Sequence, residues 1–495
     1  MHLPRSLRTA LAATVVLTAL PLAAATHADA AVTVKRAKSL VIGIDGATFA
    51  KFAPASMPNV KGLMAAGMTA TSNLYANPMA PTYSGPGWST IATGVWPDKH
   101  NVLDNNFTSP NFGQYPDYAT RLEAANPALN TLVVGTWSPI PTKVFGSAVD
   151  TRLGGVSDAN TTTTAVNKLS TTDPDATFVH LDDVDGAGHS YGAASSQYLA
   201  ALNTADAQVG QILNAVTSRA TYADEDWQII ITADHGHTDG GGHGGNTPQE
   251  RQTFVIAKGT GFAAGSTRYD VKVSDIAPTV LAHLGVTANP AWNLDGKAVS
   301  ALTPDAFDSL RPSLNTRVDE TGIPSTVKGW TTTAPSGWSI DNSAMPAGGV
   351  TEWRGWSFAT DEFWTNVSLG QQRETNVRAR DVFAVADSDE WDDKTHNPGQ
   401  FDSTLISPAF AVTGGAQATV SYATHYKVDG PQTGDVYISY NGGTPQLLKS
   451  YRTDHNTVEK FTVNVPAGAT NARLRFRYTG TNSYFWTIDQ VSLTP

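Results

Sequence analysis

Residues that can bind metal ions are concentrated in the stretch 233–245, which reads ADHGHTDGGGHGG. The apolar run Trp227–Thr232 before it predicts a buried strand of a parallel sheet. Asp234 and His235 would then lie at the carboxyl edge of that sheet, where open α/β folds place their active sites. The glycines allow a sharp turn that returns His243 towards both residues. We predict a metal site here, and a solvated glycine-rich loop is the alternative.

Two other apolar runs also lead into acidic residues. The run Lys38–Ile44 precedes Asp45, and a run that starts at Ala176 leads into the acidic stretch 182–185, followed by His189. Because the carboxyl ends of parallel strands meet at one edge of a sheet, we expect these side chains to lie close together. The chain has no cysteine, and oxygen and imidazole ligands suit zinc, with manganese as the alternative. The carboxylates are numerous enough for two ions.

Ser84 lies at or just before the amino end of a predicted helix, because Pro86 occupies a position that the first helical turn tolerates. Backbone N–H groups and the positive end of the helix dipole would face an anion there. Simple N-capping is the alternative role for this serine. Two divalent cations about 4 Å apart would clamp the attacking and leaving oxygens of a phosphoryl displacement, and one of them would hold a serine alkoxide. Ser84 is therefore the candidate nucleophile.

The elements that must position these residues are predicted from hydrophobic periodicity. Strands are expected at Thr131–Trp137 and Phe254–Ala257, in addition to those that precede the acidic residues. Helices are expected at Met57–Gly67, at about 194–219, and at Ser274–Gly285. Strands that alternate with helices indicate an α/β domain with a mostly parallel sheet flanked by helices.

Helical periodicity disappears after about Pro312, and short runs rich in Thr, Val, Tyr and Trp alternate with turn residues. This pattern is typical of an antiparallel β-sandwich. A chain of 495 residues is also too long for one compact domain. We predict an α/β domain over 31–315 and a jelly-roll-like sandwich over 316–495.

Composition and the amino terminus restrict the function classes. A formal net charge of −11 argues against a nucleic-acid-binding surface. Residues 1–30 combine two arginines, an apolar run and the small-x-small site Ala28-Asp29-Ala30, which are the features of a signal peptide. No later segment is apolar enough to span a bilayer. We therefore expect a secreted, soluble protein.

Several motifs occur in the order seen in the alkaline phosphatase superfamily, and the chain most resembles its type I phosphodiesterase/nucleotide pyrophosphatase branch. The resemblance covers about residues 38–286, and the motifs that carry it are Asp45-Gly46, Pro81 to Gly94, Trp96 to His100, Asp185-x-x-x-His189, Asp234-His235-Gly236 and Asp275-x-x-Pro278-Thr279.

The resemblance implies two zinc sites and a serine nucleophile. One zinc would be bound by Asp185, His189 and His243, and the other by Asp45, Asp234 and His235, with Ser84 bridging towards the second. Asp182 and Asp183 are the alternatives to Asp185, which alone has the matching histidine four residues later. His243 fits superfamily members that carry Gly-His-Gly soon after Asp-His-Gly, whereas the nucleotide pyrophosphatases place this histidine much farther downstream. His237 and Asp239 are interpreted as supporting or loop residues, and His100, His180 and His283 as structural.

Two positions depart from the nucleotide pyrophosphatase pattern, which has Thr as nucleophile and Asn three residues later. Here these positions are Ser84 and Gly87, so the backbone N–H of Gly85 and the zinc ions are expected to stabilise the phosphoryl oxygens. Sulfatases of the same fold use Cys/Ser-x-Pro-x-Arg, and Trp88 stands where the arginine belongs. Sulfatase activity is therefore not expected.

The expected activity is zinc-dependent cleavage of phosphodiester or pyrophosphate bonds in a small, nucleotide-like substrate, through a phosphorylated Ser84. Phosphomonoester hydrolysis is one alternative, and a surface or glycan-binding protein with an inert front domain is another. In the sandwich, the acidic turn Asp387–Asp393 is a candidate calcium site or a solvated loop. Trp353, Trp356 and Trp364 would stack on sugar rings or belong to the core, and contact with cell wall or glycan is a prediction for this domain.

Overall fold

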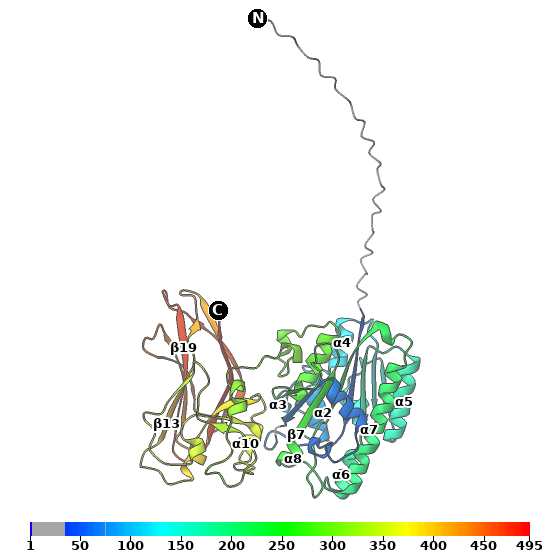
Figure 1. Ribbon diagram of the computed structural model, residues 1–495, viewed down its shortest axis with the longest axis horizontal. Coiled ribbons are helices and arrows are strands. Elements are labelled where there is room, and N and C mark those ends of the chain that lie inside the picture. Colours follow the sequence, from blue (N-terminus) through cyan, green and yellow to red (C-terminus); the bar gives the residue numbers. More distant parts are fainter. Residues whose placement is uncertain (2–34, 75) are drawn as a thin grey trace. The chain divides into compact units, whose positions relative to one another are not determined.

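The computed structural model describes residues 1, 35–74 and 76–495 (Figure 1). The predicted signal peptide therefore lies outside the described residues, apart from Met1. From Arg36 to Pro495 the chain forms one compact unit, which contains both the α/β domain and the sandwich.

The α/β domain is built on an eight-stranded sheet with the strand order β4-β3-β5-β1-β6-β7-β2-β8. Only β7 runs antiparallel to its neighbours β6 and β2, so the prediction of a mostly parallel sheet is confirmed. The strands are β1 (Arg36–Ile44), β2 (Met68–Asn73), β3 (Thr131–Gly135), β4 (Thr151–Gly154), β5 (Ala176–Leu181), β6 (Glu225–Thr232), β7 (Gln252–Lys258) and β8 (Ser266–Arg268).

Helices cover both faces of this sheet, and α5 and α7 run along one side of it in Figure 1. Because side chains alternate along a strand, Leu40 and Ile42 of β1 join the core beneath α1, α5 and α7, whereas Val41 joins the core beneath α2, α4 and α9. The helices are α1 (Pro58–Ala66), α2 (Ser84–Thr93), α3 (Pro97–His100), α4 (Tyr118–Ala125), α5 (Asp158–Thr171), α6 (Asp183–Tyr191), α7 (Ser196–Thr217), α8 (Pro248–Arg251) and α9 (Ile276–His283).

Three adjacent strands at the centre of the sheet carry the predicted acidic residues. β1 lies between β5 and β6, and Gly43 of β1 pairs with His180 of β5 and with Thr232 of β6. The residues that follow these strands therefore emerge at the same carboxyl edge. The register alone thus brings the segments that begin at Asp45, Asp182 and Asp234 together.

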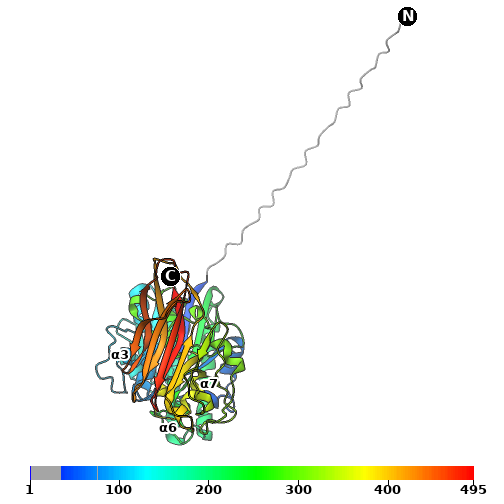
Figure 2. The same ribbon diagram turned by 90° about the vertical axis from the view of Figure 1, so that its left-hand side faces the viewer.

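The carboxyl-terminal domain consists of two packed antiparallel sheets, as predicted, and Figure 2 looks onto its strands. One sheet has the order β10-β13-β19-β16-β17, with β14 beside β19, and the other has the order β18-β15-β20-β12-β11-β9. The strands are β9 (Trp330–Thr331), β10 (Ser339–Asp341), β11 (Ser357–Thr360), β12 (Val382–Asp387), β13 (Phe401–Ile406), β14 (Phe410–Ala411), β15 (Gln417–Tyr426), β16 (Thr433–Tyr440), β17 (Gln446–Tyr451), β18 (His455–Asn464), β19 (Asn471–Gly480) and β20 (Phe485–Thr494).

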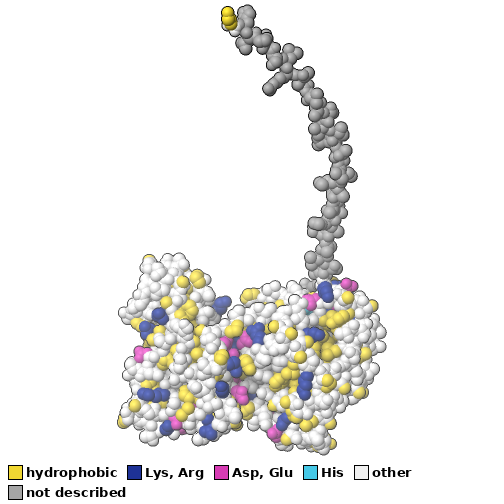
Figure 3. All heavy atoms as spheres, in the orientation of Figure 1, with side chains coloured by type: hydrophobic (Ala, Val, Ile, Leu, Met, Phe, Trp, Pro, Cys, Tyr) yellow, Lys and Arg dark blue, Asp and Glu magenta, His cyan; other side chains and the backbone are white. Residues whose placement is uncertain are grey.

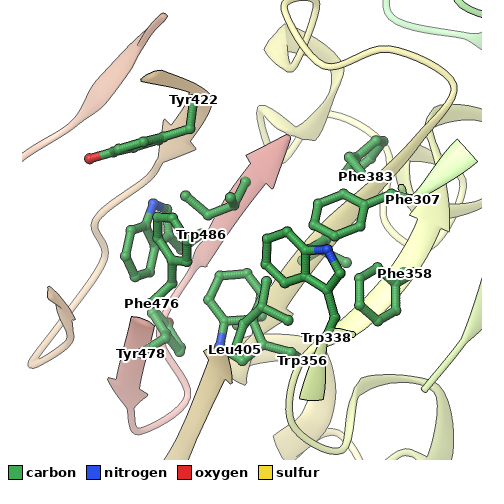
Figure 4. Packing of buried hydrophobic residues seen from close by; sticks show 14 of the residues in the cluster. Phe307, Trp338, Trp356, Phe358, Phe383, Leu405, Tyr422, Phe476, Tyr478 and Trp486 are labelled. Carbon is green, nitrogen blue, oxygen red and sulfur yellow. The ribbon is translucent and has the colours of Figure 1, made fainter. Parts of the chain in front are cut away.

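Aromatic side chains fill the space between these two sheets. Trp338, Trp356 and Trp486 pack among phenylalanines in Figure 4. Trp353, Trp356 and Trp364 are each fully buried, so they belong to the core and are not a sugar-stacking surface. Phe307, which precedes the predicted boundary at residue 315, packs into the same core.

The acidic turn of the sandwich forms a buried salt-bridge cluster. The helix α11 (Ser388–Asp392) starts in this turn, and α10 (Asp361–Thr365) lies earlier in the domain. The Arg373 guanidinium lies 3.0 Å from Asp387 and 2.7 Å from Glu390. These carboxylates therefore already have a cationic partner, and calcium binding at this turn stays a prediction.

The two domains share buried ion pairs. Arg380, which precedes β12, donates to both carboxylate oxygens of Asp275 in the α/β domain, at 2.7 and 2.8 Å. Arg378 donates to Asp98 at 2.7 Å and to Asp295 at 3.1 Å. The sandwich thus supplies cations that neutralise the buried carboxylates of Asp275 and Asp295 and the exposed carboxylate of Asp98.

The surface is mixed in charge. On the face seen in Figure 3, lysine and arginine side chains are scattered among acidic ones and form no continuous basic area. None of the described helices combines the length and apolar character needed to cross a membrane.

Candidate metal centre and nucleophile

Ser84 is the first residue of α2, and its side chain faces the acidic edge of the sheet. Its Oγ lies 3.3 Å from His235 Nε2 and 3.5 Å from Asp45 Oδ1, and the residue is 7% exposed. The structure thus brings Ser84 together with the two predicted ligands that follow β1 and β6. The open amino end of α2 lies at the same place, as expected for a site that receives an anion.

Asp234 completes the group of ligands around Ser84. The Gly46 N–H donates to its Oδ1 at 3.2 Å. Its Oδ2 is buried, has no hydrogen-bond partner among the described residues, and lies 3.3 Å from His235 Nε2. A buried carboxylate oxygen without a partner is costly, and a bound cation would satisfy it.

The second group of predicted ligands lies beside the first. His189 Nε2 lies 3.0 Å from His243 Nε2 and 3.3 Å from Asp185 Oδ2, and His243 Nε2 lies 3.4 Å from Asp185 Oδ1. A tetrahedral zinc ion with bonds of about 2.0–2.1 Å holds its ligand atoms roughly 3.3 Å apart. The three side chains already have this spacing, so they fit a zinc ion.

Hydrogen bonds fix the tautomers of two of these histidines. His243 Nδ1 lies 2.8 Å from the carbonyl oxygen of Thr82, and His235 Nδ1 lies 3.1 Å from that of Gly236. A carbonyl oxygen can only accept, so both Nδ1 atoms carry the proton. Each Nε2 is left with a lone pair directed to its cluster, as a metal ligand requires.

His237 lies beside Asp185, His189 and His243, but its distance from Asp185 does not suit a shared metal ion. Its Nε2 lies only 2.7 Å from Asp185 Oδ1, which is a hydrogen-bond distance and too short for two ligands of one ion. His237 therefore supports Asp185, which is one of the roles that the sequence predicts for it. Although burial acts in the opposite direction, this hydrogen bond and the neighbouring histidines hold the pKa of Asp185 below its usual value.

His180 and Trp88 orient Asp45. His180 Nε2 and Trp88 Nε1 lie 2.9 and 2.8 Å from Asp45 Oδ2, which leaves Oδ1 facing Ser84. His180, for which a structural role is predicted, thus holds the candidate ligand Asp45 in place. His100 and His283 do have structural contacts: His100 bonds Thr90 at 3.1 Å, and His283 lies against backbone carbonyls.

The structure corrects the expected source of phosphoryl stabilisation. The Gly85 N–H, which was expected to serve the substrate, donates to Asn105 Oδ1 at 2.7 Å. A donor side chain at position 87 is impossible, because a Cβ on Gly87 would lie 2.6 Å from the Asp234 carbonyl oxygen. Asn105 is held next to Ser84 instead, and its amide nitrogen has no partner among the described residues. The sequence contains no signal for this contact across 20 residues.

Asp182 lies beside the two groups as a free carboxylate. Its side chain makes no hydrogen bond or ion pair within the described part of the chain, and it is partly exposed. Burial, with repulsion from Asp185 next, raises the pKa of Asp182 to about 7. A cation bound in the site would reverse this shift.

The electrostatics of the cluster fit bound cations. Burial is the main cause that raises the pKa of Asp45, and repulsion from the Asp234 carboxylate is the second cause. Burial likewise raises the pKa of Asp234, with repulsion from the Asp185 carboxylate as the second cause. Burial lowers the pKa values of His235 and His243, which keeps both imidazoles neutral. Neutral imidazoles and crowded carboxylates are the donor set that a divalent cation stabilises.

A mostly parallel sheet with these candidate ligands at its carboxyl edge agrees with the alkaline phosphatase superfamily, which the sequence motifs predict. The sequence model of one family, "Type I phosphodiesterase / nucleotide pyrophosphatase", matches residues 39–143 and 137–379. The chain belongs to this family, as the sequence motifs predict.

Known proteins with similarity to the chain have several activities. "GPI ethanolamine phosphate transferase 1" of Gibberella zeae is 34% identical over 118 residues, which cover 24% of this chain and 11% of that protein. "Ectonucleotide pyrophosphatase/phosphodiesterase family member 3" of Bos taurus is 25% identical over 207 residues, which cover 36% of this chain and 22% of that protein. The chain thus covers less than a quarter of the length of these curated relatives.

Solved structures are similar at a lower level of identity. "Phosphonate Monoester Hydrolase of Agrobacterium radiobacter" has 17% identity and a TM-score of 0.42, with 55% of this chain and 78% of that chain covered. Human ectonucleotide pyrophosphatase/phosphodiesterase 5 has 14% identity and a TM-score of 0.42, with 54% of this chain and all of that chain covered.

Proposed function

We propose that the protein is an exported, two-metal phosphodiesterase that works through a covalent phosphoserine at Ser84. The observation that carries the proposal is the position of the Ser84 hydroxyl, 3.3 Å from His235 Nε2 and beside the unpartnered oxygen of Asp234. Asp45, Asp234 and His235 would hold one divalent ion, and Asp185, His189 and His243 the other. When bound, such ions supply Lewis-acid stabilisation of the attacking and leaving oxygens.

In the proposed reaction, Ser84 Oγ loses its proton to solvent and forms a bond to phosphorus while the bond to the leaving oxygen breaks. The leaving alkoxide departs with the electron pair and takes a proton from solvent. A water oxygen then forms a bond to phosphorus and loses a proton to solvent, while the Ser84–phosphorus bond breaks and Oγ regains a proton. His180 and Trp88 keep Asp45 in position during both steps.

Asn105 is placed to bind a phosphoryl oxygen with its free amide N–H groups. Replacing it with alanine is expected to lower kcat about 100-fold with a smaller change in KM, because the donor acts on charge that develops in the transition state. Steady-state kinetics on a diester measures this. Asn106→Ala is the matched control, because the Asn106 amide is bound to Asp104 at 2.9 Å. Equal losses in both variants would contradict this role.

The proposed function is tested with metal-loaded protein on bis-p-nitrophenyl phosphate and p-nitrophenyl phosphate. We expect the diester to be the better substrate and a chelator to abolish its turnover. A preference for the monoester would assign the protein to the phosphomonoesterases. Turnover of neither ester by protein with both ions bound would overturn the proposal.

Transfer of the phosphoryl group to an alcohol is the second candidate function. It is favoured by the relatives that are named ethanolamine phosphate transferases. The two functions share the step that forms the phosphoserine and differ in the acceptor that releases it. Product analysis with added glycerol separates them, because a transferase forms a glycerol ester at the expense of the hydrolysis product.

A further inference from the structure

We propose that a cavity between the α/β domain and the sandwich binds a small oxyanion, such as a carboxylate, and that the ammonium group of Lys272 is its main contact. This inference goes beyond the proposed function and does not depend on the reaction at Ser84. It starts from a buried ammonium group that pairs with no acidic side chain among the described residues.

The cavity has a volume of about 130 Å³ and is lined from both domains. Hydroxyl and amide side chains form much of its wall, with Ser72, Asn73 and Gln252 from the α/β domain and Thr360 and Thr365 from the sandwich. Because one water molecule takes about 30 Å³ of liquid volume, the cavity has room for about four waters or for one anion of the size of acetate or phosphate. The wall is polar, as an ion-binding cavity requires.

Lys272 is the buried cation of this cavity. The residue is only 6% exposed, and it lines the cavity. Its backbone N–H donates to Asp275 Oδ2 at 2.7 Å, but its ammonium group has no hydrogen bond or ion pair among the described residues. Burial is the main cause that lowers the pKa of Lys272 to about 8, so most of the protein still carries the ammonium form at pH 7. A buried charge without a partner is costly, and an anion in the cavity would offset that cost.

The charged groups around Lys272 compensate one another in pairs. Those that act on its pKa are Asp361, Arg380, Asp275 and Arg251. Arg380 donates to both carboxylate oxygens of Asp275, at 2.7 and 2.8 Å, and Arg251 lies 3.3 Å from Asp361. The two acids therefore already have cationic partners, and Lys272 keeps a positive charge that no neighbour compensates. One negative charge in the cavity would balance it.

Arg311 adds further hydrogen-bond donors to the same cavity. Its guanidinium lies 3.6 Å from the centre of the Tyr269 ring, and its Nε donates to Asp381. Its two terminal amino groups make no hydrogen bond within the described part of the chain. Lys328 and Glu362 also line the cavity, but both are exposed and their charges are opposite. An ammonium and a guanidinium are the donors that typically bind a carboxylate or a phosphate.

The test measures binding of sodium acetate to the metal-loaded full chain by isothermal titration calorimetry, with sodium chloride at equal ionic strength as the reference. We expect acetate to bind, and Lys272→Met to weaken this binding at least about tenfold, because a hydrogen bond to a charged group is lost. Lys328→Met is the matched control, since Lys328 lines the same cavity but is exposed, and it should change the affinity less than about threefold. Acetate that binds at the metal centre would do so equally in all three proteins.

Proton uptake is a second readout, which the unmodified protein provides. About half of the Lys272 side chains are protonated at pH 8, because their pKa is about 8. A bound anion favours the charged form and raises this pKa. Binding of acetate at pH 8 should therefore take up as much as about half a proton per anion, as measured by calorimetry in two buffers with different ionisation enthalpies. The uptake should disappear in Lys272→Met.

Failure of acetate to bind more tightly than chloride would overturn the proposal, as would binding that persists in Lys272→Met or that takes up no proton. The same titrations with inorganic phosphate identify the source of the oxyanion, because tighter binding of phosphate that depends on Lys272 would support the site and assign it to phosphate. The Tm of Lys272→Met in chloride should not fall, since methionine removes a buried charge without a partner. A large fall would mean that the ammonium has a stabilising partner within the protein, which would also overturn the proposal.

Discussion

Replacement of Ser84 by alanine is expected to lower kcat/KM for a phosphodiester by about 10³-fold or more. The reason is that the variant lacks the hydroxyl that lies 3.3 Å from His235 Nε2 at the amino end of α2. Ser84→Thr keeps a hydroxyl and should retain activity within about tenfold of the unmodified protein. Acid quenching during turnover, followed by mass spectrometry of the peptide, should find phosphate or its ester on Ser84 and nowhere else.

Ser89 offers a matched control on the same helix. It is fully buried, and its Oγ has no hydrogen-bond partner among the described residues. Ser89→Ala should therefore leave both kinetics and metal content unchanged. Metal content must also be measured in Ser84→Ala, since loss of an ion would mimic loss of the nucleophile. More than about a tenth of the activity in a fully metallated Ser84→Ala protein would rule out a covalent mechanism through this residue.

Replacement of Arg380 by alanine is expected to lower the free energy of unfolding by about 3–5 kcal/mol. Arg380 is 8% exposed and donates to both oxygens of Asp275, which is fully buried. Removal of the guanidinium leaves a buried carboxylate that keeps only backbone N–H donors, those of Lys272 and Lys297. Guanidinium denaturation followed by tryptophan fluorescence measures the change.

Arg477 provides a matched arginine–aspartate pair at the surface. It binds both oxygens of Asp402 at 2.9 and 2.6 Å, but its side chain is 46% exposed. Arg477→Ala should cost at most about 1 kcal/mol, because water solvates both charges once the pair is broken. Similar losses in the two variants would mean that burial of the Arg380–Asp275 pair does not determine its effect. The same result would mean that the ion pair between Arg380 of the sandwich and Asp275 does not stabilise the α/β domain.

The sequence determines which strands end in potential ligands. Asp45, Asp185 and the Asp234-His235 pair each follow an apolar run, and parallel strands deliver such residues to one edge of a sheet. The predicted β1, β3, β5, β6 and β7 are all present, because long apolar runs have few alternatives to a buried strand. Several short or polar elements, such as α5 and β4, carry no strong pattern and are not predicted from the sequence.

Only the tertiary structure decides how these residues are supported. Asn105 contacts Gly85 from the loop after α3, and His180 contacts Asp45 from the neighbouring strand, so neither contact has a local pattern. The role of His237 depends on its 2.7 Å contact with Asp185, which only packing sets. The candidate metal ligands directly follow apolar runs of the sequence, so they can be identified from the sequence alone. Hydrogen-bond partners, free carboxylates and shared ion pairs such as Arg380–Asp275 depend on chain segments far apart, which only the folded structure brings together.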